Sequence, residues 1–140
     1  MPVDRELVTR KIALILGDLR DLEPLTKRAP DRSLNDQVRQ LAAERLLERM
    51  IGRMLDINYH VITERDGLPP KDFYESFLRL GHLGVLPSDL ARAMAPAAGL
   101  RNRLAHEYHE IDHAKVQEAA AQALVLVPKY LDAVRKSLEP

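Results

Sequence analysis

The hydrophobic residues of this 140-residue chain recur at helical rather than strand-like intervals. Near the N-terminus they are separated by four, three, four and three positions, which places them on one face of a helix of about five turns. These residues are Val8, Ile12, Ile15, Leu19 and Leu22. Pro24 follows, and proline cannot continue the backbone hydrogen-bond ladder. The pattern predicts an amphipathic helix that ends at this proline.

A second, longer helix is predicted from about residue 34 to 63. The residues that form a stripe along one face of this helix follow the helical period with a slow drift. They are Val38, Leu41, Arg45, Leu46, Met50, Met54, Ile57 and Val61. About thirty residues is long for a helix of a globular domain. Such a helix usually forms the spine of a bundle or a dimer contact, and the turn residues from Gly67 to Pro70 end it.

The helices predicted after residue 70 are short, except for the last one. Phe73 to Leu80 predicts a helix that ends at Gly81 or Gly84, and Pro87-Ser88-Asp89 starts another. Pro96 forces a break, and helical periodicity resumes at Asp112, with Pro128 as either a kink or a boundary. No stretch alternates with a period of two. We therefore expect one all-α domain over residues 1–140, an up-and-down bundle of four to five helices.

Composition narrows the chemistry. The chain has 21 basic and 21 acidic side chains and a formal net charge of zero, so any nucleic-acid binding must depend on a local cluster. The neutral balance also leaves room for a partner protein. The absence of cysteine excludes disulfides, thiolate metal sites and cysteine nucleophiles. No long apolar run and no signal-peptide pattern occur, so we expect a cytoplasmic protein with no membrane contact.

One segment, residues 99–113, differs in composition from the apolar stripes around it. It carries Arg101, Asn102, Arg103, His106, Tyr108, His109 and His113, and thus three of the five histidines. On an ideal helix Asn102 and Arg103 lie about 40° and 60° from His106, whereas Arg101 lies about 140° away. Arg101 and His106 converge only if the helix ends near His106 or a second subunit brings them together.

These residue types suit metal-free RNA cleavage. That reaction needs a base for the 2′-hydroxyl proton, an acid for the leaving 5′-oxygen and a cation for the developing phosphate charge. Histidine titrates near neutrality, and arginine offers a permanent forked charge. Asn102 is able to bond a phosphate, a ribose hydroxyl or His106 itself.

Other interpretations remain open for the same residues. Arg101 and Arg103 also fit surface salt bridges, and His106 fits a helix end. His106, His109 and His113 share one helix face, as metal ligands do, but acidic residues lie between them and no second cluster supplies further ligands. We therefore predict a solvated face of mixed charge there, without metal. Tyr108 is by default an aromatic anchor against the core.

The sequence from Arg101 to Tyr108, RNRLAHEY, resembles the Arg-x4-His-x-Tyr signature of HepT-like toxins in the HEPN superfamily. The lead-in YESFLRLGHLGVLPSDLARAMAPAAGL (residues 74–100), the closing Ile111-Asp112 and the long helix ERLLERMIGRMLDINYHVI (residues 44–62) are similar to the same family. The resemblance covers residues 40–112 in detail and the chain ends by length and pattern.

The resemblance implies a specific function. HEPN domains are helical and dimerise so that two such motifs meet across a cleft. Members of this subfamily are typically metal-independent ribonuclease toxins, paired with a minimal nucleotidyltransferase (MNT) antitoxin. By resemblance, Arg101 and His106 are catalytic, Asn102 is the polar residue that commonly follows the arginine, and Tyr108 is the hydroxyl that the antitoxin modifies with AMP. We also assign Asn102 and Arg103 to substrate binding, although Arg103 equally fits a surface charge.

Two functional hypotheses therefore stand at this point. In the first, the protein is an endoribonuclease toxin that acts on RNA as a homodimer, needs no cofactor and is neutralised at Tyr108. In the second, it is a non-catalytic helical subunit that pairs with a nucleotidyltransferase and binds nucleotide. The intact Arg101 and His106 favour the first hypothesis, and the zero net charge is compatible with the second.

Overall fold

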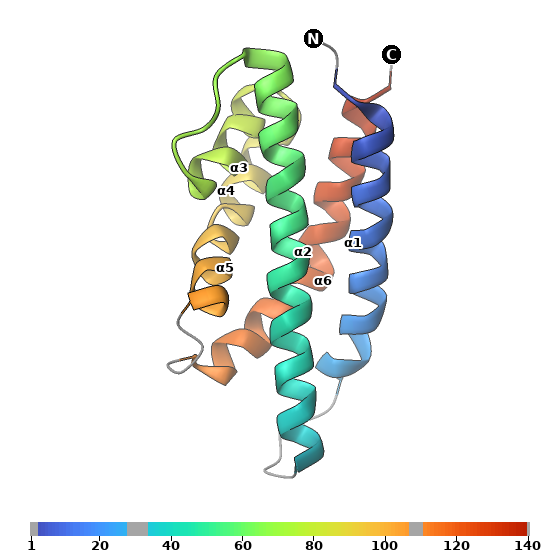
Figure 1. Ribbon diagram of the computed structural model, residues 1–140, viewed down its shortest axis with the longest axis vertical. Coiled ribbons are helices and arrows are strands. Elements are labelled where there is room, and N and C mark those ends of the chain that lie inside the picture. The colour runs from blue at the N-terminus through green and yellow to red at the C-terminus, as the bar shows by residue number, and fades with distance from the viewer. Residues whose placement is uncertain (1–2, 28–33, 107–110, 140) are drawn as a thin grey trace.

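The computed structural model describes residues 3–27, 34–106 and 111–139, and these residues form six helices (Figure 1). The helices are α1 (Arg5–Thr26), α2 (Leu34–Asp66), α3 (Phe73–His82), α4 (Ser88–Met94), α5 (Ala97–His106) and α6 (His113–Ser137). No strand occurs within the described ranges. The prediction of an all-α fold is confirmed.

The helices form an up-and-down bundle around α2 (Figure 1). α1 and α6 pack against α2 and against each other, while α3 and α5 pack on another side of α2. In the view of Figure 1, α1 runs down and α2 runs up, the segment after α2 descends to the start of α3, α3 runs back up, α4 and α5 run down, and α6 returns up. The glycine turn after α3 reverses the chain into α4, and Pro96 separates α4 from α5. The two ends of the chain consequently lie at the same end of the bundle.

Aspartate side chains start three of the helices. Asp4, Asp72 and Asp112 precede α1, α3 and α6, and each accepts a hydrogen bond from a free backbone N–H of the first turn. The accepting oxygens lie 3.0, 2.8 and 3.0 Å from the nitrogens of Leu7, Glu75 and Ala114. Such caps satisfy backbone donors that have no partner within the helix, and each typically contributes about 1 kcal/mol.

The core is a single apolar cluster to which all six helices contribute. The stripe predicted on the first helix is buried throughout, with Val8, Ile15 and Leu22 fully inaccessible. The largest fully buried side chains are Tyr130, Phe77, Ile15, Leu22, Leu47, Met50, Met54, Ile57, Ile62 and Leu80. No helix of the described ranges is both long enough and apolar enough to cross a bilayer.

Two prolines lie inside helices. The prediction that Pro24 ends α1 is wrong, because the helix continues to Thr26. Leu25 packs against the core, and Arg39 of α2 donates to the carbonyls of Pro24 and Leu25 at 3.3 and 3.5 Å, which satisfies acceptors at the helix end. Pro128 does not divide α6, since residues on both sides of it are buried in the core and hold the helix together.

At the start of α2, the burial of side chains differs from what the hydrophobic pattern predicts. Val38 and Leu41 follow the helical period but are 56% and 64% exposed. The lower end of α2 in Figure 1 extends beyond the neighbouring helices, and these two side chains are largely uncovered by the described residues. Periodicity identifies the face of a helix, but it does not show how far along the helix its neighbours reach.

Two glycines shape the turn between α3 and α4. Gly84 has a φ of +78°, a left-handed conformation that favours glycine, and it follows the end of α3. Gly81 lies within α3, and a Cβ there would come within 2.9 Å of Ala91 Cβ on α4. The first glycine thus turns the chain, and the second lets α3 and α4 approach closely.

Candidate active site

α5 carries most of the predicted motif. The helix starts directly after Pro96 and ends at His106, with Ala98 and Leu104 buried on its inner face. Arg101 is half-buried, whereas Asn102, Arg103 and His106 are exposed. The motif therefore lies on a helix anchored to the core, and most of its polar side chains face solvent.

The guanidinium of Arg101 packs on an aromatic ring. Its Cζ lies 5.7 Å from the centroid of the Phe73 ring, within the range of a cation–π contact. Tyr59 of α2 meets the Phe73 ring edge to face, with centroids 5.9 Å apart and planes at 78°. Among the described residues Arg101 has no carboxylate partner, and its buried Nε has no hydrogen-bond acceptor.

His106 is the last residue of α5, and its imidazole is exposed. Both Arg101 and His106 are helical, so five positions of regular helix separate their directions by about 140°. Nothing within the described chain brings the two side chains into contact. The α5 geometry thus leaves the arginine and the histidine of one chain apart.

Arg103 lies on yet another side of α5. It lines a mostly apolar cavity of about 200 Å³ between α2, α5 and α6, and a second cavity of about 210 Å³ between α5 and the start of α6. Lys115 of α6 lines both cavities as well. Two positions along a helix correspond to about 200° of rotation, so Arg103 and Arg101 point in nearly opposite directions. The structure groups Arg103 with Lys115 rather than with Arg101.

The other predicted site residues are described only in part. Tyr108 and His109 lie outside the described residues. His113 starts α6, and its Nδ1 lies 2.9 Å from Glu44 Oε1 of α2, an ion pair when the imidazole is protonated. Within the described ranges no three potential metal-ligating side chains cluster.

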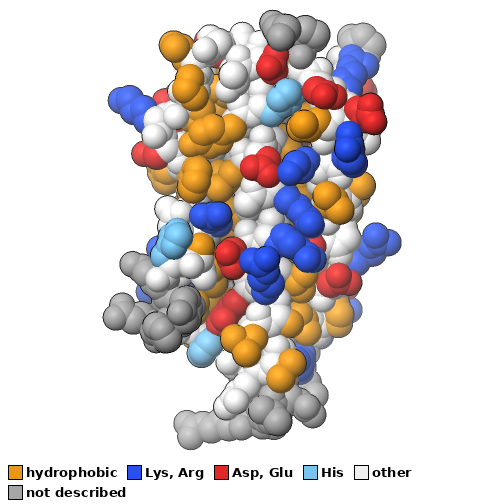
Figure 2. Space-filling view, in the orientation of Figure 1, with side chains coloured by type: hydrophobic (Ala, Val, Ile, Leu, Met, Phe, Trp, Pro, Cys, Tyr) orange, Lys and Arg blue, Asp and Glu red, His pale blue; other side chains and the backbone are white. Residues whose placement is uncertain are grey.

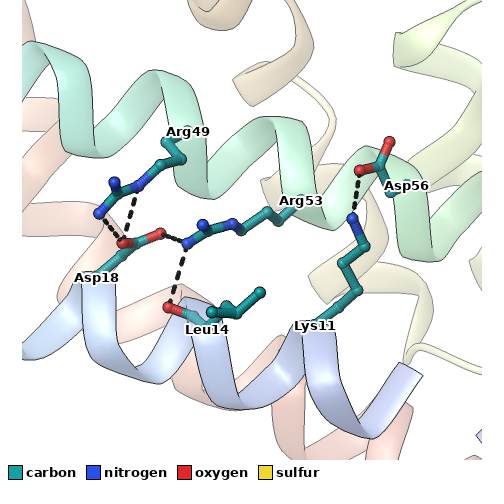
Figure 3. A network of polar contacts seen from close by, with 6 residues as sticks. All are labelled: Lys11, Leu14, Asp18, Arg49, Arg53 and Asp56. Atoms are coloured by element: carbon teal, nitrogen blue, oxygen red, sulfur yellow. Dashed lines mark hydrogen bonds and ion pairs between the residues drawn. The ribbon is translucent and has the colours of Figure 1, made fainter. Parts of the chain in front are cut away.

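A buried ion-pair cluster between α1 and α2 was not predicted from the sequence (Figure 3). Asp18 is 2% exposed, and its carboxylate lies 2.6 Å from Arg49 Nη2 and 2.8 Å from Arg53 Nη1. Arg53 also donates to the Leu14 carbonyl at 3.5 Å. The signal was present, because Asp18 falls between the core residues of α1 and the two arginines are four positions apart on α2.

Lys11 and Asp56 form a further bridge at 2.9 Å across the same two helices. Figure 2 shows basic side chains gathered in a column over this face. The column is not a free basic surface, because Lys11, Arg49 and Arg53 each have a carboxylate partner.

A second buried polar chain connects α6, α2 and α3. The Tyr130 hydroxyl lies 2.6 Å from Asn58 Oδ1, Asn58 Nδ2 donates to Ser76 Oγ at 3.1 Å, and Ser76 Oγ donates to the Phe73 carbonyl at 2.6 Å. Burial raises the pKa of Tyr130 well above its ordinary value, so this phenol stays protonated and structural. Burial, with Asp72 and Glu75 nearby, also raises the pKa of Tyr59.

The protein is an all-α bundle in which the half-buried Arg101 and the exposed His106 lie five positions apart on α5, and its similarity to known proteins gives its family. The family described as "Ribonuclease HepT-like" matches residues 15–136, and the chain belongs to it. A protein named "tRNA nuclease HepT" from Aphanizomenon flos-aquae is 32% identical over 136 residues, covering 97% of this chain and 92% of that protein. A "Putative RNase" from Archaeoglobus fulgidus is 28% identical over 85 residues, 61% of this chain and 64% of that protein.

Solved structures share the fold at low sequence identity. A chain of a toxin–antitoxin crystal structure with AMP-PNP superposes with a TM-score of 0.82 at 18% identity, covering 94% of this chain and 99% of that one. A cytosolic protein of unknown function from Bacillus subtilis, YutE, gives a TM-score of 0.79 at 18% identity, with coverage of 98% and 92%. These two likenesses establish the helical fold.

Proposed function

We propose that the protein is an endoribonuclease toxin of a toxin–antitoxin pair that cleaves RNA without a metal ion. The observation that carries the proposal is the state of Arg101 on α5, five residues before His106: a permanent cation without a counter-ion among the described residues. The tRNA nuclease name of a relative supports an RNA substrate, and the toxin–antitoxin structure supports a partner antitoxin.

The reaction divides between the two residue types. The 2′-oxygen attacks the adjacent phosphorus while a base takes its proton, and the P–O5′ bond breaks as the 5′-oxygen gains a proton. His106 acts as base or acid, because histidine alone among side chains has an unperturbed pKa near neutrality. Arg101 stabilises the extra charge on the pentavalent phosphate. Asn102 binds the RNA beside this centre, and Arg103, on the side of α5 that faces Lys115, binds it further away.

The active site is composed across a homodimer. Arg101 and His106 of one chain point about 140° apart on α5, so a second copy has to supply one of them at each site. A homodimer related by a two-fold axis would place two such mixed sites symmetrically.

Mixing two inactive variants tests the catalytic and the composite parts together. His106→Ala and Arg101→Ala are each expected to lose cleavage, in the presence of EDTA as in its absence. After mixed refolding, heterodimers contain one site with both wild-type residues, so activity should return. If His106→Ala cleaved RNA like the wild type, the mechanism would be wrong. If the mixture stayed inactive while heterodimers formed, the composite site would be wrong.

Regulation is proposed to act at Tyr108, through an MNT-type antitoxin that uses ATP. The tyrosine oxygen attacks the α-phosphorus, pyrophosphate leaves, and the AMP then carries negative charge beside His106. That charge competes with RNA phosphate for Arg101. Tyr108→Phe should keep cleavage but escape neutralisation, which mass spectrometry and an RNA assay with antitoxin and ATP would measure. AMP on the Phe variant would overturn the assignment.

A further inference from the structure

Arg101 differs from the paired arginines of the bundle in what holds its side chain. Arg49 and Arg53 are held by a carboxylate, whereas Arg101 rests on the Phe73 ring. A ring holds a guanidinium through its face and occupies none of the N–H donors, while a carboxylate takes two of them. Arg101 is therefore held in place without a carboxylate of the described residues on its guanidinium.

The buried Nε of Arg101 points to the same conclusion. A buried donor without an acceptor is unfavourable and uncommon in folded proteins, and such a group calls for an explanation. The guanidinium carbon lies over the Phe73 ring, which neither accepts a conventional hydrogen bond nor neutralises the charge. An incoming anion would satisfy the arginine without first displacing a carboxylate.

Phe73 is itself held from two sides. Tyr59 packs edge to face against the ring, which fixes the ring plane from α2. The Phe73 carbonyl accepts from Ser76, the last link of the buried chain that runs through Asn58 to Tyr130. The first turn of α3 is thus tied to α2 and α6, and the ring beneath Arg101 has a defined position.

We infer that Phe73 is a positioning residue, which orients the guanidinium of Arg101 toward the RNA phosphate while leaving its N–H donors unoccupied. The inference rests on the proposed function for its substrate. It predicts that the aromatic ring at position 73, rather than the apolar volume alone, sets the efficiency of the arginine.

Kinetics of ring-removing and ring-keeping variants test this role. Phe73→Leu is expected to lower kcat on the order of ten-fold with KM nearly unchanged, since small misplacement of a group that acts in the transition state is costly. Phe73→Tyr keeps the ring and should restore most of the rate. Tyr74→Leu removes the adjacent, 51% exposed aromatic side chain and serves as the matched control with wild-type kinetics.

A double-mutant cycle assigns the effect to Arg101. In an Arg101→Lys background, the Phe73→Leu change should cost far less than ten-fold, because the group it orients is already altered. Equal losses in both backgrounds, or equal losses in Phe73→Tyr and Phe73→Leu, would overturn the positioning role.

Nuclear magnetic resonance separates failure of this inference from failure of the proposed function. The Arg101 Nε–H resonance, assigned by its disappearance in Arg101→Lys, should show a ring-current shift that Phe73→Leu removes and Phe73→Tyr retains. Inorganic phosphate should move this resonance in the wild type at lower concentration than in Phe73→Leu. If the protein cleaved no RNA but these shifts were seen, only the proposed function would fall. If phosphate moved the resonance equally in both proteins, the inference would fall.

Discussion

Two regions of the bundle hold arginines near its core, and they hold them in opposite ways. Between α1 and α2, the carboxylate of Asp18 is 2% exposed and receives Arg49 and Arg53 (Figure 3). Between α3 and α5, Arg101 lies on Phe73 without a carboxylate among the described residues. In the first region the charges are satisfied within the chain, and in the second the described residues supply no counter-ion, which under the proposed function leaves the cation for an anion of the RNA.

The difference shows that local basic charge is a poor guide to an anion site. The column of Lys and Arg over α1 and α2 is the more conspicuous basic surface in Figure 2, yet Arg49, Arg53 and Lys11 have partners there. Arg49 and Arg53 compensate the buried carboxylate of Asp18, whereas Lys11 bridges to the exposed carboxylate of Asp56. Arg101 is one residue in a neutral chain, but no carboxylate of the described residues holds it.

The largest expected effect is on stability, from removing both cations of Asp18. Arg49→Met with Arg53→Met leaves a buried carboxylate without compensation and should lower the free energy of unfolding by about 3 kcal/mol. Urea unfolding followed by circular dichroism measures this, with Asp18→Leu added to both changes as the control that removes the stranded charge. A loss below about 1 kcal/mol would mean that the cluster is not structural.

Removing the guanidinium of Arg101 should lower activity rather than stability. Arg101→Ala is expected to lower RNA cleavage by about 10²–10³-fold, the usual effect of losing one group that stabilises transition-state charge. Its free energy of unfolding should change by less than about 1 kcal/mol. Arg103→Ala, on the far side of α5, is the matched control with a smaller loss of rate. A stability loss as large as that of the Arg49 and Arg53 double variant would remove the contrast.

The third prediction is that added salt affects the two regions differently. The Asp18 cluster is largely buried, so the unfolding free energy should respond weakly to added NaCl, whereas RNA binding should weaken steeply. For an uncleavable 2′-deoxy oligonucleotide, Arg101→Ala should reduce the slope of log K against log[NaCl] by about 0.7, the value for one phosphate contact on a single strand. An unchanged slope would indicate that Arg101 contacts no phosphate.

The smallest effect is expected at Asp132, an exposed carboxylate that, like Asp18, is paired with two basic side chains. Asp132 on α6 lies 2.8 Å from Arg135 and 3.1 Å from Lys136, and hydrogen bonds from these two residues lower the pKa of Asp132 below its ordinary value of 3.8. A lowered pKa in the folded state adds stability above the unfolded pKa of about 4, and the gain is lost as pH falls through the folded value.

Asp132→Asn should therefore reduce stability slightly at pH 7 and match the wild type in strong acid. Unfolding curves at the two pH values measure this difference. Because the ion pairs of Asp132 are exposed, the loss at pH 7 should be much smaller than that of the buried cluster. A loss as large as that of the Arg49 and Arg53 double variant would mean that burial does not set the strength of these pairs.

Several elements of the molecule could be predicted because their causes are local. The stripe from Val8 to Leu22 is buried as its intervals predict, and α5 starts directly after Pro96. The end of α1 could not be predicted from Pro24 alone. Its last turn is completed by Arg39, which is fifteen residues away and reaches α1 only in the folded bundle.

In the candidate site, too, some features could be predicted from the sequence and others could not. The motif from Arg101 to His106 could be read directly from the residues, and α5 places them as the helical period predicts. The Phe73 ring beneath Arg101 is twenty-eight positions earlier in the chain, and no spacing indicates that contact. Likewise, Arg103 was grouped with the motif, whereas the structure turns it toward Lys115 and the α5–α6 cavities.

The amino-acid sequence by itself determined most of the helices, the family signature and the identity of the candidate site residues, because helical periodicity, capping and turn preferences depend on near neighbours. Only the tertiary structure decided which arginines are neutralised and which remains available. That outcome depends on which carboxylates and rings the packing of α1 on α2, and of α3 on α5, brings within a few ångströms of each guanidinium.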